Sequence, residues 1–235
     1  KKEYFDSILF FRMGDFYEMF NEDAKTASGI LQIALTARNK KTNPVPMCGI
    51  PHHSANLYIT KLLKAGKKVA ICEQTEDPKF SKGLVKREVV RIITPGTILD
   101  NNILDPKKDQ FIASIYSLKN QIGLAAVDLS TGVFRVTQFD GDNALSLLSD
   151  ELHKLDPKEI IIPNSVKDQI QPWLPKGEVF VHTEEDWTFS FGDAYRQLIK
   201  HFRTQSLEGF GCENMNVAIS SAGALICYLR ETQKS

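Results

Sequence analysis

The chain has 235 residues, of which 42% are hydrophobic and 25% are charged, and its formal net charge is zero. This composition is typical of a globular protein with one large or two medium domains. No apolar run approaches the length of a membrane helix, and the first residues are charged rather than signal-like, so we expect neither a membrane span nor a signal peptide.

The zero net charge hides an uneven distribution along the chain. Residues 1–107 carry 17 Lys and Arg against 12 Asp and Glu, a net charge of +5, whereas residues 108–235 carry 12 against 17, a net charge of −5. The basic half is the candidate for phosphate contacts, and the acidic half is better suited to docking another protein.

The first half of the chain reads as a mixture of strands and helices. An apolar strand is expected at residues 8–12, and a helix is expected at residues 22–32, followed by a polar loop with basic residues at 38–46. A second helix is expected from Ser54 to Gly66. Two β-branched strands then follow at residues 69–72 and 89–93, with a polar stretch at 75–86 between them.

The second half opens with three strands in quick succession and continues with alternating helices and strands. The expected strands are 111–118, 122–128, 133–139, 159–162 and 179–182, and the expected helices are 143–155, 166–174, 193–202 and 217–231. An antiparallel meander followed by alternating units predicts a mixed sheet with helices packed on it, in an order like that of a ribonuclease H-type fold.

The predicted organisation is therefore two α/β domains joined by a linker. The first, residues 1–99, has a mixed sheet, and the second, residues 109–235, has the ribonuclease H-like order. Residues 100–108 are polar and aperiodic and form the expected linker.

The segment Gly14-Asp15-Phe16-Tyr17-Glu18 is the most informative part of the chain. In a strand, alternation would point Phe16 and Glu18 the same way, which places an aromatic wedge beside a hydrogen-bonding carboxyl group. On an exposed surface such a pair could enter between stacked bases and test the edge of one of them. The alternative is that Phe16 fills a core and Glu18 is an ordinary surface acid.

With these residues in hand, the chain closely resembles the N-terminal part of the MutS family of DNA mismatch-recognition proteins. Several further stretches match that family in order: Phe11-Arg12-Met13, Met47-Cys48-Gly49-Ile50-Pro51, Val69-Ala70-Ile71-Cys72-Glu73-Gln74, Val89-Val90-Arg91-Ile92-Ile93-Thr94-Pro95-Gly96-Thr97 and Ala126-Val127-Asp128-Leu129-Ser130-Thr131-Gly132. The combination is far more specific than one five-residue motif, and the presence of both Phe16 and Glu18 favours the repair branch of the family.

The resemblance implies a mismatch-binding domain followed by a connector domain that couples DNA reading to an ATPase and to the partner MutL. The lever, the clamp and the ATPase, with its ATP and Mg²⁺, are expected beyond Ser235, because no Gly-x-x-x-x-Gly-Lys-Ser/Thr motif occurs in the 235 residues. This stretch itself is expected to be neither an enzyme nor a cofactor site. The complete protein is expected to be a cytoplasmic, nucleoid-associated bacterial homodimer that binds mismatched duplex DNA.

The resemblance also implies roles for individual residues. Phe16 matches the family residue that wedges beside a mispaired base from the minor groove, and Glu18 matches the residue that hydrogen-bonds to that base. Arg38 matches a position that reaches the DNA backbone, and Lys40 and Lys41 extend the same loop. For these three cations a solvated polar loop is the alternative.

Met13 and Met47 resemble family residues beside the wedge that would buttress Phe16. For both, simple core packing is the alternative. Cys48, Cys72, Cys212 and Cys227 contain no Cys-x-x-Cys pair and are expected to be reduced core residues, and the adjacent His52 and His53 are expected to form a turn, so no metal site is predicted.

Two other functions are alternatives to mismatch recognition. A ribonuclease H-like domain suggests a two-metal nuclease, for which Asp128, Asp150 and Glu151 are the candidate carboxylates. However, residues 128–132 read more simply as a turn. The second alternative is a protein-interaction module with no DNA reading of its own.

Overall fold

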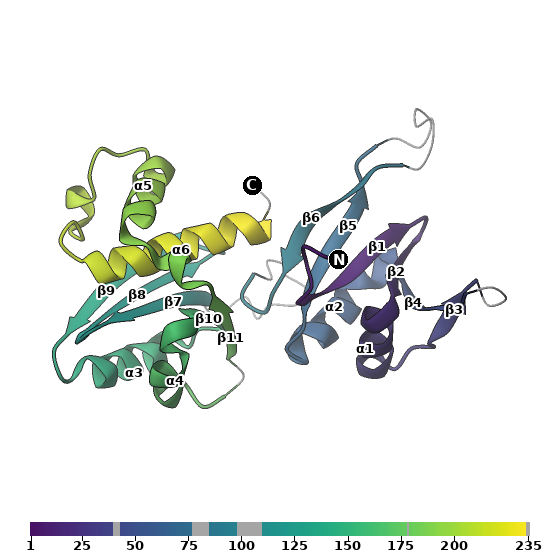
Figure 1. The fold of residues 1–235 in the computed structure, drawn as a ribbon, viewed down its shortest axis with the longest axis horizontal. Coiled ribbons are helices and arrows are strands. Elements are labelled where there is room, and N and C mark those ends of the chain that lie inside the picture. The colour runs from purple at the N-terminus through teal and green to yellow at the C-terminus, as the bar shows by residue number, and fades with distance from the viewer. Residues whose placement is uncertain (40–42, 77–84, 98–109, 178, 234–235) are drawn as a thin grey trace. The chain divides into compact units, whose positions relative to one another are not determined.

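The computed structural model describes residues 1–39, 43–76, 85–97, 110–177 and 179–233 (Figure 1). The chain forms two compact units, the first built mainly on residues 1–103 and the second on residues 104–230. The expected linker at residues 100–108 lies outside the described ranges. None of the described helices combines the length and hydropathy that a membrane crossing requires.

The first unit is built on a six-stranded sheet in the order β3-β4-β2-β1-β5-β6. Its strands are β1 (Ser7–Met13), β2 (Phe16–Phe20), β3 (Thr36–Arg38), β4 (Val45–Pro51), β5 (Lys68–Gln74) and β6 (Arg87–Ile93). Strands β1 and β5 pair in parallel and all other neighbours pair antiparallel, which confirms the mixed sheet that the sequence predicts.

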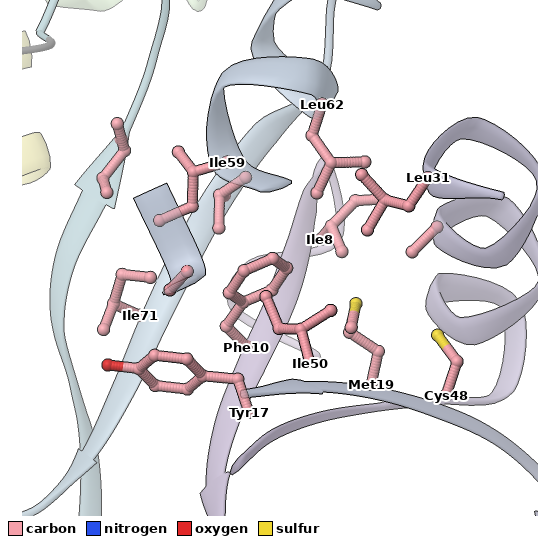
Figure 2. Close-up of a cluster of buried hydrophobic side chains, with 14 of the residues drawn as sticks. Ile8, Phe10, Tyr17, Met19, Leu31, Cys48, Ile50, Ile59, Leu62 and Ile71 are labelled. Carbon is pink, nitrogen blue, oxygen red and sulfur yellow. The ribbon is translucent and has the colours of Figure 1, made fainter. Parts of the chain in front are cut away.

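Helices α1 (Asn21–Leu31) and α2 (Ala55–Lys64) bury one face of this sheet (Figures 1 and 2). Alternate strand residues supply the sheet side of the core: Ile8, Phe10, Tyr17, Met19, Cys48, Ile50, Val69 and Ile71. The helices contribute small and aliphatic side chains, among them Ala24, Ala27, Leu31, Ile59 and Leu62. Because strand side chains alternate, the residues between these core positions point to the opposite face.

The polar loop expected at residues 38–46 is wrong in part. Arg38 ends strand β3, which pairs with β4, and residues 47–51 of β4 in turn pair with the whole of β2. Propensity gave no sign of these strands, because Pro44 and Pro46 disfavour strand structure. Tertiary pairing with β2 overrides that local preference, so Arg38 is fixed on the sheet.

The second unit has a five-stranded sheet in the order β11-β10-β7-β8-β9. Strands β7 (Phe111–Leu118), β8 (Gln121–Asp128) and β9 (Val133–Asp140) form the antiparallel meander. Strands β10 (Glu159–Pro163) and β11 (Phe180–Glu184) then add in parallel to β7 and to β10. A meander extended by two parallel strands is the ribonuclease H-like order that the sequence predicts.

Helices cover both faces of this second sheet (Figure 1). On one face α3 (Ala144–Leu155) and α4 (Lys167–Ile170) pack on a core that contains Phe111, Ile115 and Leu124. On the other face α5 (Phe191–Phe202) and α6 (Asn216–Gln233) pack on Ile112, Ala125 and Ile161. Buried strands of a sheet covered on both sides are apolar at successive positions, as Phe111, Ile112 and Ala113 are.

The expected helix at residues 166–174 is broken into shorter pieces. A 3₁₀ turn at Asn164–Val166 leads into α4, and a second 3₁₀ turn at Gln171–Trp173 follows it. Pro172 explains the second break, because it has no backbone N–H to donate and its ring obstructs the preceding turn.

Candidate nucleic-acid interface

The hairpin between β1 and β2 carries Phe16 at its tip. Met13 pairs with Phe16, so Gly14 and Asp15 alone form the turn. Gly14 has φ 58°, a left-handed conformation that glycine adopts without steric cost. A side chain of β1 stabilises the turn, because Arg12 Nε donates a hydrogen bond to the Gly14 carbonyl oxygen at 2.6 Å.

Phe16 and Glu18 lie on the face of the sheet that the helices leave uncovered. Phe16 is 50% exposed, whereas Tyr17 between the two residues points into the core and is 5% exposed. Phe16 does not fill the core, so the structure excludes that alternative. The geometric part of the prediction, an accessible ring and a carboxyl group on one face, is what the strand alternation produces.

Glu18 occupies a partly enclosed position on the same face. Its strand neighbours are Phe11 on β1 and Gly49 on β4. Its Oε2 is buried and accepts no hydrogen bond from the described residues. Arg38 Nη1 lies 3.8 Å from that oxygen and forms an ion pair with it. The Oε2 atom is thus held by the Arg38 charge, on a side of the strand where Gly49 presents no side chain.

Arg38 reaches Glu18 across β4, which separates β3 from β2 in the sheet. Its side chain is 52% exposed, so the guanidinium group is also accessible from solvent. Lys40 and Lys41, the other cations predicted to meet phosphates, lie outside the described residues.

The two methionines predicted to flank the wedge stand at different distances from it. Met13 is the direct cross-strand neighbour of Phe16. Met47 instead pairs with Phe20, four residues along β2, which corresponds to roughly 13 Å. Pro51 takes the β4 position beside Phe16, and the support of Phe16 by Met47 stays a prediction. Both methionines are half-buried and neither belongs to the core cluster.

Beneath the hairpin lies a group of polar side chains that the sequence did not point to. The Tyr17 hydroxyl donates to Glu73 Oε1 on β5, and burial, followed by this hydrogen bond, raises the pKa of Tyr17 well above its usual value. The Arg12 guanidinium lies 5.6 Å from the centre of the Tyr17 ring, and the His52 ring lies 5.5 Å from it. The His52 backbone N–H donates to the Asp15 carbonyl oxygen at 2.8 Å, so the predicted turn at His52 also supports the hairpin.

The cysteines are thiols, as expected, and three of the four are buried. Burial raises the pKa of the Cys48 thiol to about 11, and burial also raises the pKa of Cys72 and of Cys212. These thiols are therefore protonated at neutral pH and act as small apolar residues.

In the second unit, the nuclease candidate Asp128 is committed to a turn. Its carboxylate accepts hydrogen bonds from the Ser130 N–H at 2.8 Å, the Ser130 hydroxyl at 2.7 Å and the Thr131 hydroxyl at 3.0 Å. Burial alone would disfavour the charged form, but these hydrogen bonds outweigh it and lower the pKa of Asp128. Glu151 pairs with Lys154, and the described residues contain no group of three or more His, Cys, Asp or Glu placed to hold a metal ion.

The second unit also contains an apolar cavity of about 230 Å³ between β9, α5 and α6. Its lining includes Phe134, Leu198, Phe202, Phe210 and Ile219. The lining also contains Cys212 and Met215 but no acidic or basic side chain, and the sequence pattern did not predict the cavity.

An exposed aromatic ring and a cation on an open sheet face are features that nucleic-acid-binding proteins use to contact single bases. The site therefore points to the class of nucleic-acid-binding proteins. Residues 1–102 match the family MutS domain I, and residues 110–235 match MutS domain II. The chain belongs to the MutS family.

Curated relatives agree with this assignment. The chain is 48% identical over 240 residues to DNA mismatch repair protein MutS of Desulforapulum autotrophicum, covering 99% of the chain and 27% of that protein. It is 48% identical over 243 residues to the protein of the same name from Halothermothrix orenii and 46% identical over 236 residues to that from Thermodesulfovibrio yellowstonii. In both cases the match covers 100% of the chain and 26% of the relative. The chain thus spans about a quarter of the length of these relatives.

Proposed function

We propose that the first unit recognises mispaired or unpaired bases in duplex DNA, with Phe16 as a wedge that enters from the minor groove. The observation that carries this proposal is the 50% exposure of Phe16 at the tip of a rigid hairpin. The family assignment supports it, because curated relatives are named for mismatch repair.

The physical basis is the low cost of deforming DNA at a mismatch. The minor groove distinguishes base pairs poorly, so a protein that reads there senses how easily the duplex deforms. Inserting a side chain between base pairs costs a few kcal/mol of stacking, and less where pairing is already lost. Stacking on the Phe16 ring offsets this cost by about 1–3 kcal/mol. One shared deformation therefore reports many kinds of mispair.

Glu18 is proposed to hydrogen-bond to the mispaired base beside the wedge. A carboxylate is an unusual group to bring close to a polyanion, since phosphates repel it. We propose that Glu18 carries a proton, or shares one with the base, in the mismatch complex. The same group then disfavours binding to intact duplex, where no base offers that proton.

Contacts with the DNA backbone are assigned to the cations at the edge of the same face. Arg38 is exposed enough to meet a phosphate, and Lys40 and Lys41 extend the set. Met13 stands directly beside Phe16 and can limit its sideways movement. Met47 is proposed to meet the duplex further along the sheet, beside Phe20.

The second unit is proposed to be a connector that couples DNA reading to an ATPase outside this chain and to MutL. Its net charge of −5 over residues 108–235 suits protein docking better than DNA binding. ATP and Mg²⁺ are assigned to the remainder of the protein, because the residues present here lack a phosphate-binding loop. The complete protein is proposed to act on DNA as a homodimer.

The direct test compares the affinity of the full-length protein for a G·T mismatch and for the matched duplex. Phe16→Ala is expected to lower mismatch affinity by about tenfold or more and to leave matched binding nearly unchanged. Phe5→Ala is the control, because Phe5 is 81% exposed in the same unit but lies before β1, away from the hairpin tip. Equal losses on both duplexes with Phe16→Ala would overturn the proposal.

A further inference from the structure

The Glu18 carboxyl group has one oxygen atom buried beside a single described positive charge. Its Oε2 is buried and accepts no hydrogen bond from the described residues, and its side chain is 21% exposed. An ionised oxygen removed from water without a hydrogen bond costs free energy that only a nearby positive charge offsets. Among the described residues Arg38 supplies that charge, at 3.8 Å.

The Arg38 contact is weak enough to exchange. At 3.8 Å the pair is an ion pair rather than a hydrogen bond, and Arg38 is half exposed to water. A DNA phosphate offers a guanidinium group two parallel charge-assisted hydrogen bonds, which the buried Glu18 oxygen does not. Arg38 therefore has a better partner available once DNA lies on this face.

We propose that Arg38 is a positioning residue that couples phosphate contact to base reading through Glu18. While Glu18 has no base to bind, in the free protein and on matched DNA, Arg38 stays paired with its carboxylate. When Glu18 takes up a proton from the surrounding water as it engages a mispaired base, its carboxylate charge is neutralised and Arg38 moves to a phosphate. This inference rests on the proposed function of Glu18 and adds a switch that sharpens its discrimination.

The geometry of the sheet makes the exchange possible without a change of fold. Strand β4 separates Arg38 from Glu18, and Gly49 on β4 stands opposite Glu18 with no side chain between them. A Cβ atom built at Gly49 would lie 3.8 Å from Glu18 Cγ, so a larger residue there would stand against the carboxyl group. The absence of a side chain at Gly49 thus leaves the end of the Glu18 side chain open to the Arg38 guanidinium group.

The experiment is a double-mutant cycle in the full-length protein with Arg38→Gln, Glu18→Gln and the double variant. The ratio of mismatched to matched affinity is measured at several salt concentrations. In the protein that retains Glu18, we expect Arg38→Gln to lower this ratio by about threefold or more. In the Glu18→Gln variant, the same substitution should lower the ratio by less than about 1.5-fold. Lys25→Gln, which removes an exposed charge on α1, is the control and should leave the ratio unchanged.

The salt dependence provides an independent reading of the same switch. Arg38→Gln should reduce the slope of log affinity against log salt by about 0.9 on mismatched DNA and leave it unchanged on matched DNA. In the Glu18→Gln variant, Arg38 is free to meet a phosphate on either duplex. Adding Arg38→Gln to that variant should therefore reduce the salt slope equally on mismatched and on matched DNA. Arg38→Lys should keep the slope on mismatched DNA, because a charge is retained.

The outcomes separate this inference from the proposed function. If the wild-type protein shows no preference for the mismatch, both are overturned. If the preference exists and depends on Phe16, but the effects of Arg38→Gln and Glu18→Gln on the ratio simply multiply, only the coupling through Arg38 is overturned.

Discussion

At the scale of single residues, the exposed Phe16 ring provides hydrophobic free energy for DNA binding. A half-exposed phenyl ring leaves about 1–2 kcal/mol of hydrophobic burial unrealised in the free protein. Phe16 is exposed while its strand neighbours Tyr17 and Met19 are 5% and 0% exposed, so the hairpin does not depend on it for packing. That burial can instead be gained when the ring stacks on bases.

Glu18→Gln tests the role of charge at the second residue of the pair. The amide keeps the shape of the side chain and can hydrogen-bond to a base, but phosphates do not repel it. We expect affinity for matched duplex to rise about fivefold, which corresponds to ~1 kcal/mol of repulsion, and the preference for a mismatch to shrink. Fluorescence anisotropy on the two duplexes measures both, and an unchanged affinity for matched DNA would contradict the repulsion.

Asp128→Asn tests the turn that replaces the nuclease interpretation. The substitution removes a buried carboxylate that accepts hydrogen bonds from Ser130 and Thr131, and should cost about 1–3 kcal/mol at pH 7. Because the pKa of Asp128 is lowered in the folded state, its contribution is complete above the usual Asp pKa. It is lost as the pH falls below about 4 through the folded-state pKa, and the two stabilities should converge there.

Denaturant unfolding at about pH 7, 5 and 3 measures this difference. Both tryptophans, Trp173 and Trp187, lie in the second unit, so their fluorescence reports the unit that contains Asp128. The control is Asp150→Asn, an exposed position on α3. A stability difference that stays the same at pH 3 would contradict the assigned role of the charge.

At the scale of elements, the β1–β2 hairpin is rigid because several contacts converge on its turn. Arg12 and His52 bind the two turn carbonyl groups, and Tyr17 ties β2 to Glu73 on β5. A wedge has to transmit force to stacked bases, and a flexible tip would lose that free energy in its own ordering.

Replacing Gly14 or Gly29 by Ala tests whether the hairpin turn needs glycine at position 14. Gly14→Ala meets no atoms within 4 Å but must adopt φ 58°, which costs about 1–2 kcal/mol. Gly29→Ala also meets no atoms, but it lies within helix α1 and should stabilise the unit by about 0.5–1 kcal/mol. Native-state hydrogen exchange of the β2 amides measures both, and effects of the same sign would contradict the assigned turn.

Strong local patterns made much of this fold predictable from sequence, and long-range pairing decided the rest. The strand at residues 111–118 was predicted with its observed bounds, because its apolar run is long and ends at Lys119-Asn120. Strand β3 was missed, because three residues carry no periodicity and pairing with β4 alone orders them.

For the site too, local sequence predicted the arrangement within one strand but not the contacts between strands. Strand alternation placed Phe16 and Glu18 on one face, but it gave no information about which residues of other strands would meet them. The ion pair of Glu18 with Arg38 and the position of Pro51 beside Phe16 follow from sheet register, which the sequence does not reveal.

At the scale of the whole molecule, two units of opposite charge share one chain. Residues 108–235 carry a net charge of −5 and would repel phosphates. DNA binding by these 235 residues alone should therefore be weak.

The 235-residue chain itself tests this expectation. If Arg38, Lys40 and Lys41 make about three phosphate contacts, affinity should fall about 40-fold between 50 and 200 mM salt. Anisotropy titrations of the chain with a mismatched duplex at the two salt concentrations measure the change. A tight complex that is insensitive to salt would contradict the assignment of the contacts.

The fluorescence of a base analogue beside the mispair reports whether the Phe16 ring enters the duplex at that step. A 2-aminopurine base is placed next to a G·T mispair, and a control duplex carries it several base pairs away. Binding of the full-length protein should change the emission of the adjacent probe only, and Phe16→Ala should abolish that change. The same change with Phe16→Ala, or none with the wild-type protein, would contradict the account.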